Sequence, residues 1–533
     1  MQLADPDLWG RLSIAALWFN AGAFPYRDVF SFTAYHQPWI DHEWLSGVLF
    51  YLAMWWGGEI GLHCLKIGLI IGIFYLLFSA SCSAGIQLNA RGKLMPLWQF
   101  LALSLLLPLF GDAFYPTVRA QLFSFLYFLG FLSLLENERQ QDPQHPSWFR
   151  PLGFCLPIGV FWANTHGGFI LGLILLTLYG LGEALTHQSV KKAAPYGITL
   201  IALIVAIALL NPYGLAYWPF ILHALTMPRP FISEWSPLPL WTLDFWEVKL
   251  LMLITLALLI LSAWRQTKNK ASGIAKPSLL TPGLVLLFLI GLAIKGLRFK
   301  IFFMLGLLFY APMLVHAFYR QSSQPSPKHT KTGFNLMHCL PGIAAGGALA
   351  IVLIFYRPAY YAHTIVQTGE LAKARDLVPF PIQMMQYLKN SPYRGNLITP
   401  FTWGEFLAWN LYPRFRVNWD GRYEEVYPPQ VMNFYTEFYA LPHAHHPERI
   451  MDMANRSTGD FILIESISPN QPIMDQNPDW RLLVTDGFYF LYGRNSTLRQ
   501  FPDYRAPLPE AESPPATIGQ FFQPREMRRF QTR

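Results

Sequence analysis

Two aspartates near the N-terminus, Asp5 and Asp7, flank Pro6 directly before an apolar run. In a pair of carboxylates, one group can act as a general base that takes a proton from a hydroxyl, and the other can orient it or bind a metal ion. Asp is also a common N-cap residue, so the pair could simply cap a helix that begins at Leu8. The sequence alone leaves both interpretations open.

A second acidic group stands where this N-terminal segment meets the next apolar run. Asp41, His42 and Glu43 are three titratable residues in a row before Trp44. They could complete a catalytic site with Asp5 and Asp7. Alternatively, they could form a helix N-terminus where acidic side chains favour the helix dipole. Glu43 and His42 are therefore the next candidates for catalytic residues.

The elements that must position these residues are mostly apolar. The chain is 53% hydrophobic and only 14% charged, well below the roughly 25% charged residues of soluble domains. Residues 44–58 are apolar but short, which predicts a helix along the membrane surface. Runs of about 20 apolar residues cross a bilayer, and ten runs approach that length. These are 61–81, 94–110, 119–136, 152–163, 168–186, 194–210, 249–264, 279–294, 299–319 and 336–356.

Lys and Arg residues fall mainly into alternate gaps between these runs. Thirteen lie in the gaps 82–93, 137–151, 187–193, 265–278 and 320–335, whereas the other internal gaps and their edges hold six. Because Lys and Arg stay on the cytoplasmic side, the side with thirteen cations is predicted to be inside. Residues 1–60, 211–248 and 357–533 are then outside. The net charge of +8 is thus attributed to membrane orientation and anionic lipid, not to nucleic-acid binding.

Three cations break this rule, because Lys295, Arg298 and Lys300 lie close together on the predicted outer side. Arg119, after Tyr115 and Pro116, is a similar cation at the outer end of a run. A phosphate group would be a suitable partner for such cations, and Arg can form bidentate hydrogen bonds to its oxygens. The alternative is that these side chains only reach toward lipid headgroups.

His166 lies between two predicted spans, followed by Gly167 and Gly168. An ionisable residue beside two glycines at a membrane edge indicates a cavity, because glycine lets the backbone approach closely. A tight turn whose histidine merely faces water is the alternative.

The pattern divides the chain into a first exoplasmic loop with an interfacial helix (1–60), a membrane bundle of about ten spans (61–356), an exoplasmic domain (357–500) and a flexible tail (501–533). Strands are predicted at 395–400, 415–419, 461–465 and 481–492, the last as a hairpin about Asp486-Gly487, with helices at 376–390 and 428–455. Asp420-Gly421-Arg422 predicts a turn with an arginine ion pair. The four cysteines lie in or beside apolar runs, so no exoplasmic disulfide is expected.

Three pieces of the sequence resemble bacterial membrane glycosyltransferases of the GT-C superfamily, which use lipid-phosphate-linked sugars. The pieces are ADPDLWGRLS (4–13) with FPYRDVFSFTAYHQPWIDHEWLSGVLFYL (24–52), WANTHGGFILG (162–172), and NWDGRYEEVYPP (418–429) with WRLLVTDGFYFLYGR (480–494). Many such proteins are uncharacterised, so the resemblance implies a reaction class more than a substrate. Its members carry a span before the first loop, and an upstream span is therefore expected here.

The resemblance implies an α-helical membrane bundle with a small exoplasmic α/β domain, in a bacterial inner membrane. It implies sugar transfer from a polyprenyl phosphate, with Asp7 as the first candidate base because it precedes the best-matching residues, Leu8 and Trp9. Asp5 is second, and a divalent cation such as Mg or Mn at these two residues stays open. Phosphate binding is expected from Arg298, Lys295, Arg119 and His166. A transporter or flippase for a lipid-linked substrate and a non-catalytic glycan-binding protein are the alternatives; the oligomeric state is left open.

Overall fold

The computed structural model describes residues 7–87, 118–140, 149–227, 229, 232–270, 279–319, 380–440, 446–466 and 468–501. The chain forms two compact units. The loop–sheet unit comprises Met1–His63, Thr117–Arg119 and Pro358–Arg533, and the helical unit comprises Cys64–Pro116 and Ala120–Arg357. The first loop and the C-terminal residues, which the sequence treats as separate parts, thus belong to one unit.

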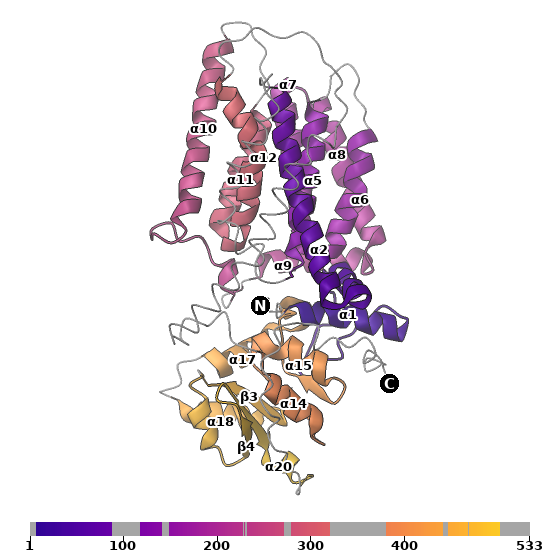
Figure 1. Ribbon diagram of the computed structural model, residues 1–533, viewed down its shortest axis with the longest axis vertical. Coiled ribbons are helices and arrows are strands. Elements are labelled where there is room, and N and C mark those ends of the chain that lie inside the picture. Colours follow the sequence, from indigo (N-terminus) through magenta and orange to yellow (C-terminus); the bar gives the residue numbers. More distant parts are fainter. Residues whose placement is uncertain are drawn as a thin grey trace. The chain divides into compact units, whose positions relative to one another are not determined.

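The helical unit is built from long apolar helices that pack against one another (Figure 1). Its helices are α5 (Gln121–Arg139), α6 (Phe149–Thr165), α7 (Ile170–His187), α8 (Ala194–Leu210), α9 (Tyr217–Thr226), α10 (Trp246–Lys270), α11 (Leu280–Lys295) and α12 (Lys300–Tyr319). The second part of α2 (Trp44–Gln87) also belongs to this unit.

Several of these helices have the length and composition of membrane spans. Among the described residues, four qualify: Ile60–Ala80, Gly167–His187, Trp246–Trp264 and Leu297–Leu314. The pair α8 and α9 is bent by 118° and would make a fifth if it counts as one span. Apolar side chains on α8 and α10 point outward, as lipid-facing residues do; Ile201 is 65% and Leu253 64% exposed. The protein is a multi-pass membrane protein, and the predicted runs 94–110 and 336–356 lie outside the described residues.

Helix α2 contains a break that separates its first part from its apolar span. Gly58 has φ 56° and ψ −143°, a conformation that only glycine adopts readily. The segment 44–57 is therefore a short helix distinct from the span that follows, as its length predicts.

The loop–sheet unit contains a five-stranded mixed sheet in the order β2-β1-β3-β5-β4. Strands β2 (Phe415–Val417), β1 (Gly395–Ile398) and β3 (Phe461–Glu465) are parallel, whereas β5 (Tyr489–Arg494) is antiparallel to β3 and to β4 (Trp480–Thr485). The predicted strands and the hairpin at Asp486-Gly487 are confirmed. The helices of this unit are α1 (Leu8–Ala21), the first part of α2, α14 (Ile382–Asn390), α15 (Gly404–Leu411), α16 (Tyr423–Val426), α17 (Pro429–Ala440), α18 (Pro447–Arg456), α19 (Gln471–Asp475) and α20 (Asn495–Leu498).

The first loop adds a short extended segment to the edge of this sheet. Ser31 forms a parallel bridge with Val417 of β2. The backbone N–H of Val417 donates to Phe30 O at 2.8 Å, and Phe32 N–H donates to Val417 O at 3.1 Å. These bonds join the first loop to the C-terminal sheet, and they bring side chains of the first loop close to those that follow β2.

Candidate functional site

Asp7 stands directly before α1, but its carboxylate does not cap that helix. The N-cap Asp7 makes no side-chain capping hydrogen bond. Instead, the backbone N–H of Gly10 donates to Oε2 of Glu405 at 2.7 Å, so a carboxyl from α15 takes the position that an N-cap aspartate normally fills. The interpretation that Asp7 only caps α1 is therefore wrong.

Gly421 marks the place where the carboxyls of Asp7 and Glu405 come close. A Cβ built on Gly421 would lie 2.8 Å from Asp7 Oδ1 and 2.9 Å from Glu405 Oε1. Burial, together with the nearby charges of Asp7 and Asp420, raises the pKa of Glu405 well above its ordinary value. The pair therefore favours a protonated Glu405 beside Asp7, because two close carboxylates resist ionising together.

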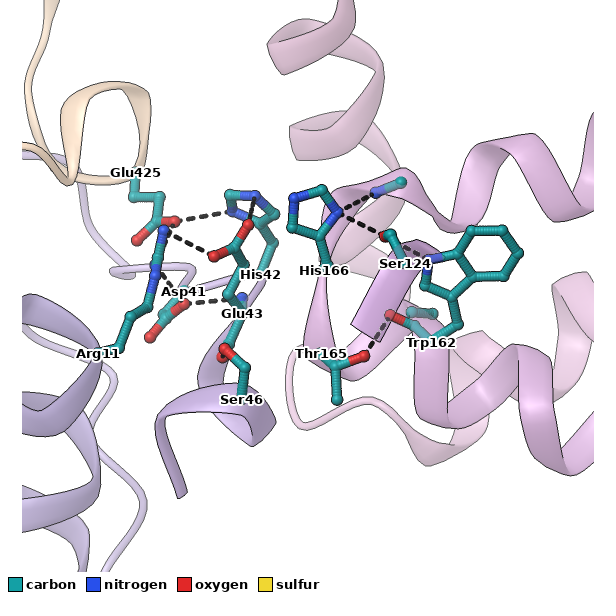
Figure 2. A network of polar contacts seen from close by, with 12 residues as sticks. Arg11, Asp41, His42, Glu43, Ser46, Ser124, Trp162, Thr165, His166 and Glu425 are labelled. Atoms are coloured by element: carbon teal, nitrogen blue, oxygen red, sulfur yellow. Dashed lines mark hydrogen bonds and ion pairs between the residues drawn. The ribbon is translucent and has the colours of Figure 1, made fainter. Parts of the chain in front are cut away.

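Beside α1 lies a second group of charged side chains, the Arg11 cluster: Arg11, Asp41, His42, Glu43 and Glu425. Figure 2 shows these side chains pointing toward one another. Arg11 Nη2 lies 2.9 Å from Glu43 Oε2, and Arg11 Nη1 lies 3.2 Å from both Asp41 Oδ1 and Glu425 Oε1. His42 Nδ1 lies 2.8 Å from Glu425 Oε1. The alternative that residues 41–43 form a helix N-terminus is supported in part, because Asp41 Oδ1 accepts a hydrogen bond from the backbone N–H of Glu43 just before α2.

Protonation in the Arg11 cluster follows from burial and charge. Burial opposes the charge on His42, but Glu425 and Glu43 outweigh it and raise the pKa of His42 to about 10. Burial and the charge of Glu425 raise the pKa of Asp41 to about 7, against the opposing effect of Arg11. His42 is therefore an imidazolium at neutral pH, suited to donating hydrogen bonds and unsuited, in this state, to taking a proton.

The raised pKa of His42 predicts a pH-dependent stability. The folded-state pKa of His42 lies above its unfolded value of about 6.5. Its protonation therefore contributes fully to the free energy of unfolding below pH 6.5, and this contribution is lost as the pH rises toward 10. Within this window, each pH unit should lower the free energy of unfolding by up to about 1.4 kcal/mol. We expect the thermal unfolding midpoint of the full chain in detergent to fall less for His42→Gln than for wild type between pH 7 and 10. Exposed His36 supplies the matched control, His36→Gln, whose unfolding midpoint should depend on pH as that of wild type does. An equal change of the midpoint with pH in wild type, His42→Gln and His36→Gln would contradict the prediction.

A buried triad of charges fastens the first loop to the C-terminal sheet. Arg422 Nη1 lies 2.6 Å from Asp28 Oδ1, and Arg422 Nη2 lies 2.6 Å from Asp420 Oδ2. Asp28, Asp420 and Arg422 are each at most 3% exposed. The predicted turn with an arginine ion pair is confirmed, and its additional partner Asp28 comes from the first loop. This triad lies beside Gly421 and so helps to place Asp7 and Glu405.

In the helical unit, His166 lies between α6 and α7 in a network with Ser124 of α5 and Trp162 of α6 (Figure 2). Its Nδ1 accepts from the backbone N–H of Gly168 at 2.9 Å and lies 2.7 Å from Ser124 Oγ. Trp162 Nε1 donates to the same Ser124 Oγ at 2.6 Å. Since His166 is only 8% exposed, the alternative of a histidine that merely faces water is wrong.

The turn between α11 and α12 carries the predicted phosphate-binding cations. The guanidinium of Arg298 lies 4.3 Å from the centroid of the Trp235 ring, and that of Arg229 lies 4.1 Å from the same centroid. Lys300 lies 4.5 Å from the centroid of Phe245. Cation–π contacts of this kind hold a charge in place without neutralising it. Lys295, the last residue of α11, is exposed.

Two predicted site residues lie elsewhere. Arg119 is half-buried, just before α5, in a segment that belongs to the loop–sheet unit. Asp5 lies outside the described residues. Among the residues that the structure describes, no group of three His, Cys, Asp or Glu side chains could hold a metal ion. A divalent cation at Asp5 and Asp7 therefore remains a prediction.

Sequence reasoning missed six residues of these networks: Arg11, Asp28, Ser124, Trp162, Glu405 and Glu425. Four of them carry a detectable signal, because they lie inside the pieces on which the resemblance rests: Arg11, Asp28, Trp162 and Glu425. Glu405 carries none, since it follows Trp403-Gly404 in a segment that reads as an ordinary helix start.

No protein-family model matches this sequence, and no curated protein sequence matches it. Among solved structures, the chain is similar to the oligosaccharyltransferase of Archaeoglobus fulgidus in its apo form, with a TM-score of 0.49 and 12% sequence identity. A second similar structure is the oligosaccharyltransferase AglB of Archaeoglobus fulgidus in complex with an inhibitory peptide and a dolichol-phosphate, also at a TM-score of 0.49 and 12% identity. Each likeness covers 87% of this chain but only 66% of the other, slightly under two thirds of its length.

Proposed function

We propose that this protein is an integral membrane glycosyltransferase of GT-C type, which moves a sugar from a polyprenyl phosphate to an acceptor hydroxyl on the exoplasmic face. The observation that carries the proposal is the carboxylate of Asp7, which stands at a helix start without capping it and lies beside Glu405. A carboxylate that lies beside a second carboxyl group is suited to act as a base. The resemblance of residues 4–13, 24–52 and 162–172 to GT-C glycosyltransferases supports this reaction class.

In the proposed reaction, Asp7 takes the proton of the acceptor hydroxyl as the acceptor oxygen bonds to the sugar C1. The bond from C1 to the phosphate oxygen breaks, and polyprenyl phosphate leaves with that electron pair. Asp5 is proposed as the second carboxylate, either orienting Asp7 or binding a divalent cation. Arg298, Lys295, Arg119 and His166 are proposed to bind the phosphate, since charge-assisted bonds to phosphate oxygens are strong. Glu43 and His42 are proposed to support the site through the Arg11 cluster.

The test is a transfer assay with the purified full chain in proteoliposomes, supplied with polyprenyl-phosphate-linked hexoses and pentoses and with crude exoplasmic acceptors. We expect one donor to lose its sugar to an acceptor, with stoichiometric release of polyprenyl phosphate. A transporter or flippase would instead move the intact donor across the bilayer. A non-catalytic glycan-binding protein would bind without cleaving. Either of these results would overturn the proposal.

The proposed location of the reaction predicts which parts of the chain face outward. In a background without the four cysteines, a cysteine at exposed Thr458 should react with an impermeant maleimide in intact cells. A cysteine at exposed Gln188 should react only after the membrane is opened, because 187–193 belongs to the cation-rich side. Labelling of both positions from the same side would refute this orientation.

A further inference from the structure

The chain turns a sharp corner between α8 and α9, which are bent by 118° relative to each other. Pro212 cannot continue a helix, and Gly214 has φ 57°, a conformation that favours glycine. The side chain of Asn211 fixes the corner, because its Nδ2 donates to Asn164 Oδ1 and its Oδ1 accepts from the backbone N–H of Tyr213, both at 3.0 Å. Specific hydrogen bonds therefore separate α9 from the helix before it.

The angle of this corner keeps α9 at the level where α8 ends. Helix α8 has 17 residues, close to the shortest length that crosses a bilayer. A bend of 118° turns the chain past the perpendicular, so α9 runs back toward the bundle instead of away from it. The ten residues of α9 extend about 15 Å, and its far end therefore lies roughly 7 Å back along the axis of α8. Figure 1 shows α9 at one end of the helical unit. If α8 crosses the membrane, α9 must lie at the membrane boundary.

One side of α9 is attached to the bundle. Tyr217 and Ile221 on this side are buried. The hydroxyl of Tyr217 donates to the backbone oxygen of Ala163 in α6 at 2.6 Å. The Tyr217 ring also stacks on Phe169, with centroids 5.8 Å apart. Helix α9 is thus fixed to the two ends of the turn 163–169, which contains His166.

The remaining surface of α9 has an apolar side and a polar side. Leu222 and Leu225 are exposed and lie on one side, because residues three apart are neighbours on a helix. His223 and Thr226 are also exposed, and they lie one residue further round the helix. A helix with an apolar side beside a polar side is typical of the boundary between lipid and water.

The apolar side of α9 continues the lipid-facing surface of α8. Ile201, Val205 and Leu209 are exposed on α8 at a spacing of four residues, which places them on one face. After the corner, Leu215 is 78% and Leu222 61% exposed. Exposed apolar surface of this kind marks a contact with protein or membrane. Its continuity with a span favours lipid as the partner.

We propose that α9 is an interfacial helix, whose leucine side lies among the lipids of one leaflet while His223 and Thr226 face water. The hydrogen bond from Tyr217 to Ala163 then holds the turn 163–169 at the same level, close to the lipid headgroups. The phosphate of a lipid-linked donor lies at this level too, so His166 could meet it without the lipid leaving its leaflet. Only this last step rests on the proposed function.

The test is electron paramagnetic resonance of the full chain in nanodiscs, with single nitroxide-labelled cysteines in a background without the four native cysteines. Labels at Leu222 and Leu225 should be reached more readily by oxygen, which concentrates in lipid, than by a water-soluble nickel chelate. Labels at His223 and Thr226 should show the reverse preference.

Two exposed positions supply the controls. A label at Ile201, within α8, should be reached by oxygen and should lie about 10 Å deeper in the bilayer than a label at Leu222, because Ile201 precedes the end of α8 by nine residues. A label at Thr458, in the loop–sheet unit, should be reached by the nickel chelate.

Three results would overturn the proposal. The nickel chelate could reach Leu222 as readily as Thr458, which would place α9 in water. The label at Leu222 could be immobile and reached by neither reagent, which would mean that another part of this chain, such as the runs 94–110 or 336–356, covers α9. Spin–spin broadening that disappears on dilution with unlabelled protein would identify a second copy as the partner. None of these measurements requires sugar transfer, so absence of transfer with the expected accessibilities would overturn only the proposed function.

Discussion

Replacing Asp7 by Asn should lower the rate of sugar transfer about 10²–10⁴-fold, the usual contribution of a general base. Asn keeps the size of the side chain but cannot take the acceptor proton. Because Asp7 makes no capping bond and Gly10 N–H is bound by Glu405, the substitution should leave α1 and the amount of folded protein unchanged. The measurement is the initial rate of transfer in proteoliposomes at saturating donor, normalised to folded protein.

Two further variants make this result specific. Asp452→Asn changes an exposed aspartate of α18 that pairs with Arg456, and it should transfer at the wild-type rate. Asp5→Asn should reduce transfer less than Asp7→Asn if Asp5 only orients the base. Wild-type rates for both Asp7→Asn and Asp5→Asn would show that neither carboxylate is the base, and Glu43 would become the next candidate.

The sequence identified the acidic residues of the first loop because chemistry-bearing types stand side by side there. It could not identify their partners, since these lie far away in the chain. Gly10 and Glu405 are 395 positions apart, and Arg11 and Glu425 are 414 apart. No local periodicity connects such pairs; contacts between distant segments, such as the pairing of residues 30–32 with β2 and the Arg422–Asp28 ion pair, bring them together.

Local patterns succeeded where the structure is itself local. The turn dipeptide Asp486-Gly487 between apolar runs predicts the β4–β5 hairpin, because Gly487 supplies the positive φ that the turn needs. The strand order β2-β1-β3-β5-β4 could not be predicted in the same way, since parallel pairing depends on contacts across long loops. Likewise, the histidine of 164–168 was found from its glycines, whereas its partner Ser124 lies on another helix.

Replacing Arg422 by Ala should destabilise the loop–sheet unit by about 3–5 kcal/mol, because it leaves the carboxylates of Asp28 and Asp420 buried without their cation. The same change should detach the first loop from β2, so trypsin should cleave at exposed Arg27 faster than in wild type. Transfer should fall as well, since Gly421, Glu405 and Asp7 lose their support. The measurements are denaturant unfolding of the full chain in detergent, followed by tryptophan fluorescence, and the rate of cleavage at Arg27.

Arg456→Ala is the matched control, because Arg456 pairs with Asp452 on the surface, with side chains 78% and 49% exposed. Such exposed pairs contribute only about 0–1 kcal/mol, so this variant should unfold like wild type. Combining Arg422→Met with Asp28→Asn and Asp420→Asn should restore most of the lost stability, because no unpaired charge then remains buried. If Arg422→Ala had the same free energy of unfolding and the same rate of cleavage at Arg27 as Arg456→Ala, the triad would not be what holds the first loop to the sheet. The position of Asp7 would then be attributed to the Gly10–Glu405 hydrogen bond, the Arg11 cluster and the pairing of residues 30–32 with β2.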